Sequence, residues 1–371
     1  MPTVCITLGT RPEAIKLAPV IRQFRQAADF QTSVILTGQH REMVDQVMQW
    51  FDLKADFDLE IMQPGQTLSD ITCRSLEGLK QIYQKLAPDI VLVQGDTTTA
   101  FAAALAAFYQ QIPVGHVEAG LRTDNLLNPF PEEANRRLIS QISQLHFAPT
   151  TQAIANLEKS GVLGGAYQTG NTVIDALLTV AAAKPDCNIP NLDWQNKRVI
   201  LSTVHRRENW GEPLDDILQG FLKIVTAFPD VVLLLPMHRN PKVREPIQAI
   251  LGQHPQIFLT EPLDYPQLVG AMQRCYMLLT DSGGLQEEAP SLGKPVLVLR
   301  ETTERPEAVT AGTARLIGTA QDNIFQSMKT LLTDDAEYQR MATAVNPFGD
   351  GTSSQQILQI VRDFLMAPES V

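Results

Sequence analysis

Three acidic residues follow apolar or proline-containing stretches, in places where a carboxylate could face a ligand. Asp96 follows the strand-like run Ile90 to Val93, and Glu118 follows Pro113 to Val117 among small residues. Glycine close to a carboxylate favours a functional role for Glu118, because the backbone can then approach a ligand. Asp96 could equally cap the helix behind it. Glu132 opens a helix after two prolines, where the helix dipole alone would favour an acid.

Basic residues follow two further strand candidates, where an anion could bind. Arg11 and Lys16 lie in GTRPEAIK, at a strand-to-helix turn whose free backbone N–H groups would meet the positive end of a helix dipole. His205 follows another apolar run and is joined to Arg206 and Arg207. A histidine beside two guanidinium groups suits a phosphate site or a general acid. The structural alternative is a capped helix with solvated basic side chains.

A glycine-rich turn offers a second place for phosphate. Ser282, Gly283 and Gly284 stand between an apolar run and a helix, so their hydroxyl and amide groups could cradle a diphosphate. Glu288 lies one turn into that helix and could accept hydrogen bonds from sugar hydroxyls. Arg305 lies in the polar loop after the next apolar run. The turn and its surroundings therefore contain the donors that a diphosphate requires.

Short apolar runs alternate with helix-like sequence along most of the chain, which predicts parallel sheets with helices on both faces. Strands are expected at 4–8, 33–36, 90–93 and 113–117 and, after a proline-containing polar stretch at 184–196, at 199–203, 231–236, 257–259, 276–280 and 296–299. We expect an α/β fold of two Rossmann-like, doubly wound domains, 1–180 and 181–352, with a cleft between them. Ligands bind beyond the carboxyl ends of such strands, where the polar turns lie.

Composition favours a globular protein that does not bind polyanions. The chain has 371 residues, of which 44% are hydrophobic and 19% charged, enough for two domains with a sizeable core. Its formal net charge of −11 argues against nucleic-acid binding, which depends on Lys and Arg neutralising phosphates. Neither a signal peptide nor an apolar stretch that could span a bilayer is found. A cytoplasmic protein without membrane or nucleic-acid partners is expected.

Several common chemistries lack their sequence patterns in this chain. The cysteines Cys5, Cys73, Cys187 and Cys275 are scattered, with neither CxxC pairs nor zinc spacing, so reduced thiols and no metal site are expected. GxGxxG, P-loop, HExxH and nucleophile-elbow motifs are absent from the sequence. These absences weigh against dehydrogenases, NTPases, zinc proteases and esterases, and no cofactor is expected.

Taken together, the motifs resemble those of the non-hydrolysing UDP-N-acetylglucosamine 2-epimerases of bacteria. The resemblance extends over nearly the whole chain, through GTRPEAIKLAPV, GQHREMVDQV, QGDTTTA, GHVEAGLRT, PEEANRR, HRRENWGEPL, TDSGGLQEEAPSLGKPV, TTERPEAV and NPFGDG. Each motif alone is weak, but their number, order and spacing are specific. The resemblance implies a glycosyltransferase-B-like architecture, a C-terminal helix at about 353–371 that returns to the first domain, and a homodimer.

The resemblance also implies roles for the residues singled out above. Those that match the catalytic residues of the family are Asp96, Glu118, Glu132 and His205. Those that match its ligand contacts are Arg11, Lys16, Ser282, Gly283, Gly284, Glu288 and Arg305. A region where many members bind a second, activating substrate molecule is matched in part by Gln39, His40 and Gln66. Gly65 and Glu42 depart from that region, which leaves activation by substrate open.

The implied reaction inverts C2 of the sugar of UDP-N-acetylglucosamine and gives UDP-N-acetylmannosamine. The C2 proton is poorly acidic, but positive charge develops at C1 as UDP departs and acidifies it. Elimination gives a 2-acetamidoglucal, and re-addition of UDP with protonation of the other face gives the epimer. Carboxylates can act as base, acid and stabilisers of an oxocarbenium-like state, whereas cations stabilise the departing diphosphate. Which carboxylate is the base and which the acid is left open.

Three other functions stay open at this stage. A hydrolysing relative would add water to the glucal and release N-acetylmannosamine and UDP. A glycosyltransferase of the same architecture would need an acceptor groove, often beside a membrane-facing helix, for which the sequence offers no candidate. A nucleotide-sugar sensor would have no need of all four catalytic residue types. For an epimerase, the product is expected to supply surface polysaccharide synthesis.

Overall fold

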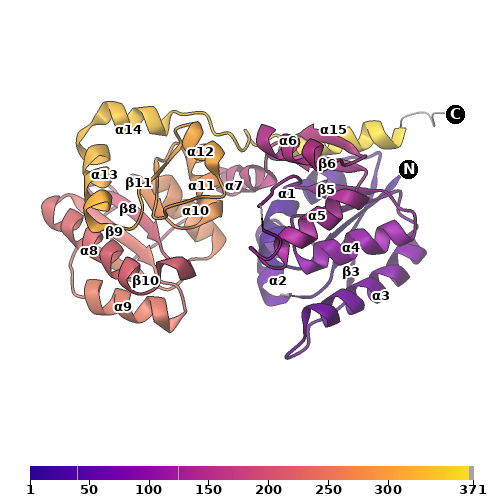
Figure 1. The fold of residues 1–371 in the computed structure, drawn as a ribbon, viewed down its shortest axis with the longest axis horizontal. Coiled ribbons are helices and arrows are strands. Elements are labelled where there is room, and N and C mark those ends of the chain that lie inside the picture. The colour runs from indigo at the N-terminus through magenta and orange to yellow at the C-terminus, as the bar shows by residue number, and fades with distance from the viewer. Residues whose placement is uncertain (40, 124, 367–371) are drawn as a thin grey trace. The chain divides into compact units, whose positions relative to one another are not determined.

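The computed structural model describes residues 1–39, 41–123 and 125–366 (Figure 1). The chain divides into two compact units, one formed by Met1–Ala176 with the segment that begins at Phe348, the other by Leu177–Pro347. Among the described residues, no helix is both long and apolar enough to cross a membrane. The C-terminal helix is described as far as Met366, so the part expected at 367–371 lies outside these residues.

The first unit is built on a parallel sheet with the strand order β3-β2-β1-β4-β5-β6-β7. Its strands are β1 (Thr3–Leu8), β2 (Gln31–Leu36), β3 (Phe57–Asp58), β4 (Ile90–Gln94), β5 (Val114–Val117), β6 (Leu145–Ala148) and β7 (Gly165–Gln168). Its helices are α1 (Arg11–Gln26), α2 (Arg41–Trp50), α3 (Leu68–Leu86), α4 (Thr98–Tyr109), α5 (Glu132–Ile142), α6 (Thr151–Lys159), the first part of α7 (Thr172–Ala182), and α15 (Ser353–Met366).

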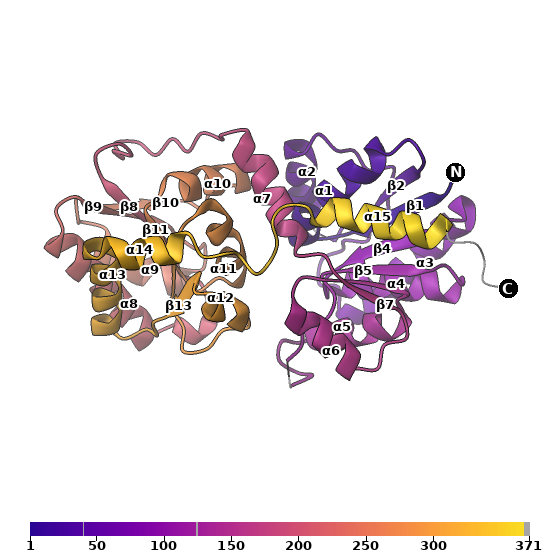
Figure 2. The ribbon, with the colours of Figure 1, turned by 90° about the horizontal axis from the view of Figure 1, so that it is seen from above.

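Helices cover both faces of this sheet. β1 and β4 are buried along almost their whole length, which is typical of parallel strands with helices on either side. α1 contacts α2 and α15, whereas α4 contacts α3 and α5 (Figure 2). The C-terminal helix α15 is held to this unit by an ion pair between Arg362 and Asp29 and by hydrogen bonds from Ser354 to Asp175. The segment after Phe348 is therefore part of the first unit.

Local sequence explains where two of these helices begin. Thr10 is the N-cap of α1, Pro12 lies in the first turn, and Glu13 reaches back to accept a hydrogen bond from the Thr10 amide. Thr97 caps α4 by accepting from the amide of Ala100. Most of α4 is alanine or threonine, and such small side chains allow α3 and α5 to pack closely against it.

The second unit has a parallel sheet with the strand order β10-β9-β8-β11-β12-β13. Its strands are β8 (Arg198–Thr203), β9 (Val231–Pro236), β10 (Ile257–Thr260), β11 (Met277–Thr280), β12 (Val296–Val298) and β13 (Ala314–Leu316). Its α-helices are α8 (Glu212–Ala227), α9 (Pro241–Leu251), α10 (Tyr265–Arg274), α11 (Gly283–Glu288), α12 (Pro306–Thr310), α13 (Gln321–Thr333) and α14 (Asp335–Ala342), with short 3-10 turns η1 (Arg207–Asn209) and η2 (Ala289–Leu292).

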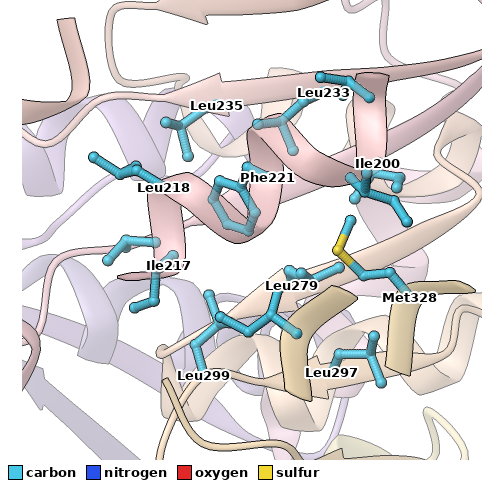
Figure 3. Close-up of a cluster of buried hydrophobic side chains, with 14 of the residues drawn as sticks. Ile200, Ile217, Leu218, Phe221, Leu233, Leu235, Leu279, Leu297, Leu299 and Met328 are labelled. Atoms are coloured by element: carbon cyan, nitrogen blue, oxygen red, sulfur yellow. The ribbon is translucent and has the colours of Figure 1, made fainter. Parts of the chain in front are cut away.

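An apolar core fixes α8 and α13 on the second sheet. Ile217 and Phe221 of α8 are fully buried in one cluster with Leu233 of β9, Leu279 of β11 and Met328 of α13 (Figure 3). Burial of side chains of this size contributes roughly 1.5–3 kcal/mol each, relative to exposure. The core therefore holds the strands of this unit in a fixed register, and with them the turns at the strand ends.

The prediction of two doubly wound parallel-sheet domains is confirmed. Each predicted strand is present, with ends that differ by two residues at most, and the stretch 184–196 contains neither helix nor strand. In both sheets the first strand lies at the centre, and the chain changes direction between β1 and β4 and again between β8 and β11. Ligands bind at such switch points in doubly wound folds. The predicted cleft between the domains stays a prediction.

Candidate active site

The residues singled out in the sequence lie at the carboxyl ends of central strands in each unit. In the first unit, Arg11 begins α1 after β1, Asp96 follows β4, and Glu118 follows β5. In the second unit, His205 follows β8 and Ser282 follows β11. Each unit therefore places its candidate residues around the switch point of its own sheet.

Glu118 is the most densely bonded carboxylate of the first unit. The Lys16 ammonium lies 2.6 Å from Oε1 and 2.7 Å from Oε2, and Gln94 Nε2 donates to Oε2. Asn171 Nδ2 donates to Oε1 over 3.3 Å. Glu118 is buried and has a φ of 63°, a left-handed conformation that is uncommon in residues other than glycine. Its carboxylate is therefore held in one place by one cation and two amides.

The other two carboxylates of the first unit are held differently. Asp96 Oδ2 accepts from Nε and Nη2 of Arg136, and Asn135 Nδ2 donates to the Asp96 carbonyl oxygen over 2.9 Å. Arg136 is in turn held by the fully buried Glu133. Glu132 begins α5, is partly exposed, and has no hydrogen bond or ion pair within the described part of the chain. Of the three, Glu132 is the carboxylate without a charged partner in the described part of the chain.

The turn between β1 and α1 is expected from the sequence to have free backbone N–H groups, but two of these groups donate to a side chain of the same turn. The amides of Gly9 and Thr10 donate to Glu13 Oε2 over 3.1 and 2.7 Å, and the Thr97 hydroxyl donates to Oε1 over 2.8 Å. Burial raises the pKa of Glu13 despite these hydrogen bonds. The expectation was wrong because the side chain of the helix itself occupies the turn. Arg11 is then the cation of this turn that could meet an anion, whereas the Lys16 ammonium is paired with Glu118.

Gln39 and Gln66 lie together, although they are 27 positions apart in the sequence. Both line a cavity of about 530 Å³, whose other walls come from Met62, Gln63, Pro64, Gly65 and Ile71. Gln39 Oε1 accepts from the Thr99 hydroxyl, and Gln66 Oε1 from Arg74. His40, predicted for the same region, lies outside the described residues.

In the second unit, His205 is held by a buried aspartate that the sequence analysis did not single out. His205 Nδ1 lies 2.8 Å from Asp281 Oδ1, and the amides of His205 and Arg206 each donate to Oδ2 over 2.8 Å. Burial raises the pKa of Asp281, but the hydrogen bonds and charge of His205 outweigh it and keep that pKa below its usual value. β8 pairs with β11 and aligns Thr203 with Thr280, so the residues after both strands must be neighbours. That pairing is the signal that could have identified Asp281.

The Ser282 turn presents unoccupied amides between two guanidinium groups. Within the described residues, the N–H groups of Gly283 and Gly284 donate to no acceptor. A methyl group on Gly283 would lie 3.6 Å from Nη2 of Arg206 and 4.0 Å from Nη2 of Arg305. Two cations next to free amides are the donors that a diphosphate prefers. The sequence analysis noted Arg206 beside His205 but did not include it among the ligand contacts.

Further contacts orient the neighbours of this turn. The Tyr265 hydroxyl donates to Glu288 Oε1 over 2.8 Å, so this buried carboxylate is fixed on α11. Arg305 pairs with the buried Glu287, and its amide donates to the Thr303 hydroxyl over 3.0 Å. Across the described residues, no three His, Cys, Asp or Glu side chains are grouped to hold a metal ion.

Comparison with known proteins covers almost the whole chain. The family model described as UDP-N-acetylglucosamine 2-epimerase matches residues 22–362. The chain belongs to the UDP-N-acetylglucosamine 2-epimerase family. The resemblance inferred from the motifs is therefore confirmed, and so is the glycosyltransferase-B-like fold class, which solved structures of this family share.

Several UDP-N-acetylglucosamine 2-epimerases are similar to this chain along their full length. The protein of that name from Escherichia coli strain K12 is 50% identical, over 97% of this chain and 98% of its own. That of Bacillus subtilis strain 168 is also 50% identical, over 96% and 94%. The structure of UDP-GlcNAc 2-epimerase from Neisseria meningitidis bound to UDP-GlcNAc has a TM-score of 0.86 and 47% identity, and covers 98% of this chain and 100% of that chain.

Proposed function

We propose that this family member interconverts UDP-N-acetylglucosamine and UDP-N-acetylmannosamine by eliminating and re-adding UDP, without net hydrolysis. The observation that carries the proposal is the buried Glu118 carboxylate, bound by Lys16 at the switch point of the first sheet. Full-length relatives with about 50% identity carry the epimerase name and support the same reaction. The substrate is then a UDP-sugar, as in the Neisseria meningitidis complex.

The three carboxylates of the first unit are proposed to divide the proton chemistry. Glu118 accepts hydrogen bonds from Lys16, Gln94 and Asn171, so it suits the work of an anion: removing the C2 proton or stabilising positive charge at C1. Glu132, which has no partner within the described chain, suits the work of proton donor to the opposite face of C2. Asp96, neutralised by Arg136, is proposed to stabilise the oxocarbenium-like state.

The second unit is proposed to hold the leaving group. The amides of Gly283 and Gly284, the Ser282 hydroxyl and the Arg305 guanidinium would bind the diphosphate while the C1–O bond breaks. His205, oriented by its buried aspartate, would stabilise or protonate the departing phosphate oxygen. Glu288 would accept hydrogen bonds from sugar hydroxyls. In the first unit, Arg11 would add positive charge near the same diphosphate, and Lys16 would contact the substrate while paired with Glu118.

Proton NMR of the purified protein with UDP-N-acetylglucosamine in deuterated water tests this proposal. We expect UDP-N-acetylmannosamine to form until an equilibrium mixture is reached, with deuterium at C2 of both nucleotide sugars and no added cofactor. Free N-acetylmannosamine and UDP accumulating to completion would instead identify a hydrolysing enzyme. A sugar that binds but stays unchanged and undeuterated would contradict both and would favour a transferase or a sensor.

Further assignments are proposed with this function. We infer that the protein is cytoplasmic. We also infer that it acts as a homodimer, as the family resemblance implies, and supplies a precursor for surface polysaccharides. The two domains are expected at 1–180 and 181–352, followed by a helix that returns to the first domain. We expect the substrate to bind between the two domains. Gln39, His40 and Gln66 are proposed to form a second, regulatory site, with Gly65 and Glu42 leaving the strength of activation open. Light scattering tests the dimer directly.

A further inference from the structure

The motif NPFGDG at 346–351 has no part in the function proposed above, although it forms close backbone contacts in the first unit. The Phe348 carbonyl oxygen accepts a hydrogen bond from the Asn171 amide over 2.6 Å. Gly349 has a φ of +127° and Gly170 a φ of +84°. A methyl group on Gly170 would lie 3.1 Å from the Phe348 carbonyl oxygen and 2.8 Å from the Ser353 hydroxyl. Only glycine permits this close approach of two chain segments.

The side chain of Asn171 is fixed at both ends. Its Oδ1 accepts from the amide of Val173 over 3.1 Å at the start of α7, and its Nδ2 donates to Glu118 Oε1 over 3.3 Å. Asn171 is buried, so the side chain has no water to turn toward. Because the Val173 amide is a donor, the amide oxygen must face it, and the NH2 group must face Glu118. The orientation of the side chain therefore follows from its own helix.

Glu118 receives one amide donor on each oxygen. Gln94 donates to Oε2 and Asn171 to Oε1, while the Lys16 ammonium contacts both oxygens. The two amides come from different elements, one from the end of β4 and one from the residue before α7. A carboxylate held only by Lys16 could rotate about its last bond, because a point-like ammonium imposes little direction. The amides supply that direction.

We propose that Asn171 is a positioning residue for Glu118, held in place by the C-terminal segment through the Phe348 carbonyl. This inference rests on the proposed function, because it assigns Glu118 a step at C2 whose rate depends on the direction of the carboxylate. Asn171 acts through Glu118 and touches no reacting atom in this scheme. The motif at 346–351 thereby serves catalysis, although it lies more than 200 positions after Glu118 in the sequence.

The test compares two substitutions of Asp for Asn, one at the proposed contact and one at an exposed helical position. Asn171→Asp keeps an oxygen to cap the Val173 amide but replaces the donor to Glu118 by a second acceptor. Asn323→Asp is the matched control, because Asn323 is exposed on α13 of the second unit. Melting temperature, kcat and KM for UDP-N-acetylglucosamine are measured for the full-length wild type and both variants.

We expect Asn171→Asp to lower kcat roughly tenfold or more while KM stays within about twofold, since hydrogen bonds to charged groups have effects of this size. Asn323→Asp is expected to keep kcat within about twofold. Equal kcat values for Asn171→Asp and wild type would overturn the inference, as would an equal loss in the control. If the wild type itself shows no exchange at C2, the proposed function fails instead.

A second variant keeps the inference testable if Asn171→Asp does not fold. Gly349→Ala changes none of the residues that contact Glu118. It places a side chain where φ is +127°, with its Cβ 3.5 Å from the Asn171 amide nitrogen. We expect the same loss of kcat at nearly constant KM. A folded Gly349→Ala protein with the kcat of the wild type would contradict the role of the C-terminal segment.

Discussion

The Asp281 carboxylate shows how a single buried residue can set the orientation of a proposed catalytic group. Its Oδ2 accepts from the amides of His205 and Arg206 and from Asn209 Nδ2, while Oδ1 faces the His205 ring. The three donors to Oδ2, with the His205 ring 2.8 Å from Oδ1, offset part of the cost of burying this charge. They also fix the His205 backbone and ring together. The imidazole is therefore presented with Nδ1 toward Asp281 and Nε2 available to a ligand.

Replacing Asp281 tests this arrangement at the scale of one residue. In Asp281→Asn an amide oxygen can still serve the backbone donors, but the NH2 group opposes Nδ1 and the negative charge is lost. We expect kcat/KM to fall about tenfold to a hundredfold, as when a hydrogen bond to a charged group is removed. The exposed Asp216→Asn in α8 is the control and should leave kcat/KM unchanged. A full rate in Asp281→Asn would show that the buried charge does not assist His205.

At the scale of elements, the two units use the same strand–turn–helix geometry in opposite ways. After β1, the side chain of Glu13 accepts from the amides of Gly9 and Thr10, so the turn is already filled by a carboxyl group of the chain. After β11, Gly283 and Gly284 keep their amides without acceptors among the described residues. The helix dipole favours an anion in both turns. Only the second turn is left for an anion from a ligand.

The pairing of β5 with β6 brings two buried histidines together and makes stability depend on pH. His116 and His146 are aligned in register, and burial lowers the pKa of each to about 4. In the unfolded chain both pKa values return to near 6.5. Between about pH 4 and 6.5 the unfolded state therefore binds more protons, and acidification favours unfolding. The stability that depends on the two rings being neutral is fully present above about pH 6.5 and is lost as the pH falls toward 4.

Urea unfolding at several pH values tests this consequence of the pairing. We expect the free energy of unfolding to decrease from pH 7 to pH 5 by up to about 1.4 kcal/mol per pH unit for each histidine. His146→Leu fills the buried position without a titrating group and should remove about half of that slope. A slope identical to that of the wild type would show that these rings do not control acid stability.

At the scale of the whole molecule, the sequence predicted elements that a local residue pattern defines. It did not predict contacts between residues that are distant in the sequence. The long apolar strands and the helix at 98–109 follow from periodicity, whereas β3 has two residues and β7 is an exposed edge strand without an apolar run. Motif resemblance supplied the candidate site residues. Asp281, Gln94 and Asn171 were missed because their partners become adjacent only through strand pairing or through the return of the C-terminal segment.

The remaining prediction for the whole molecule is that one substrate uses residues of both units. UDP carries the diphosphate but not the sugar, so UDP and the sugar nucleotide are expected to protect different sets of site residues. With UDP, we expect slower amide hydrogen exchange at Gly283 and Gly284, which have no acceptor of their own in the described structure. With UDP-N-acetylglucosamine, exchange should slow there and also in the turns that carry Asp96 and Glu118.

Mass spectrometry of deuterium uptake by the intact chain, with ligand at saturating concentration, measures both turns in one experiment. Helix α14 contacts the chain before β11, through a hydrogen bond from Tyr338 to the Tyr276 carbonyl oxygen, and serves as an internal control whose uptake should stay constant. Protection confined to the second unit with either ligand would contradict a shared site and would favour a protein that only binds the nucleotide. Protection of the turns that carry Asp96 and Glu118 by the sugar nucleotide but not by UDP follows if C1 and C2 react beside those turns.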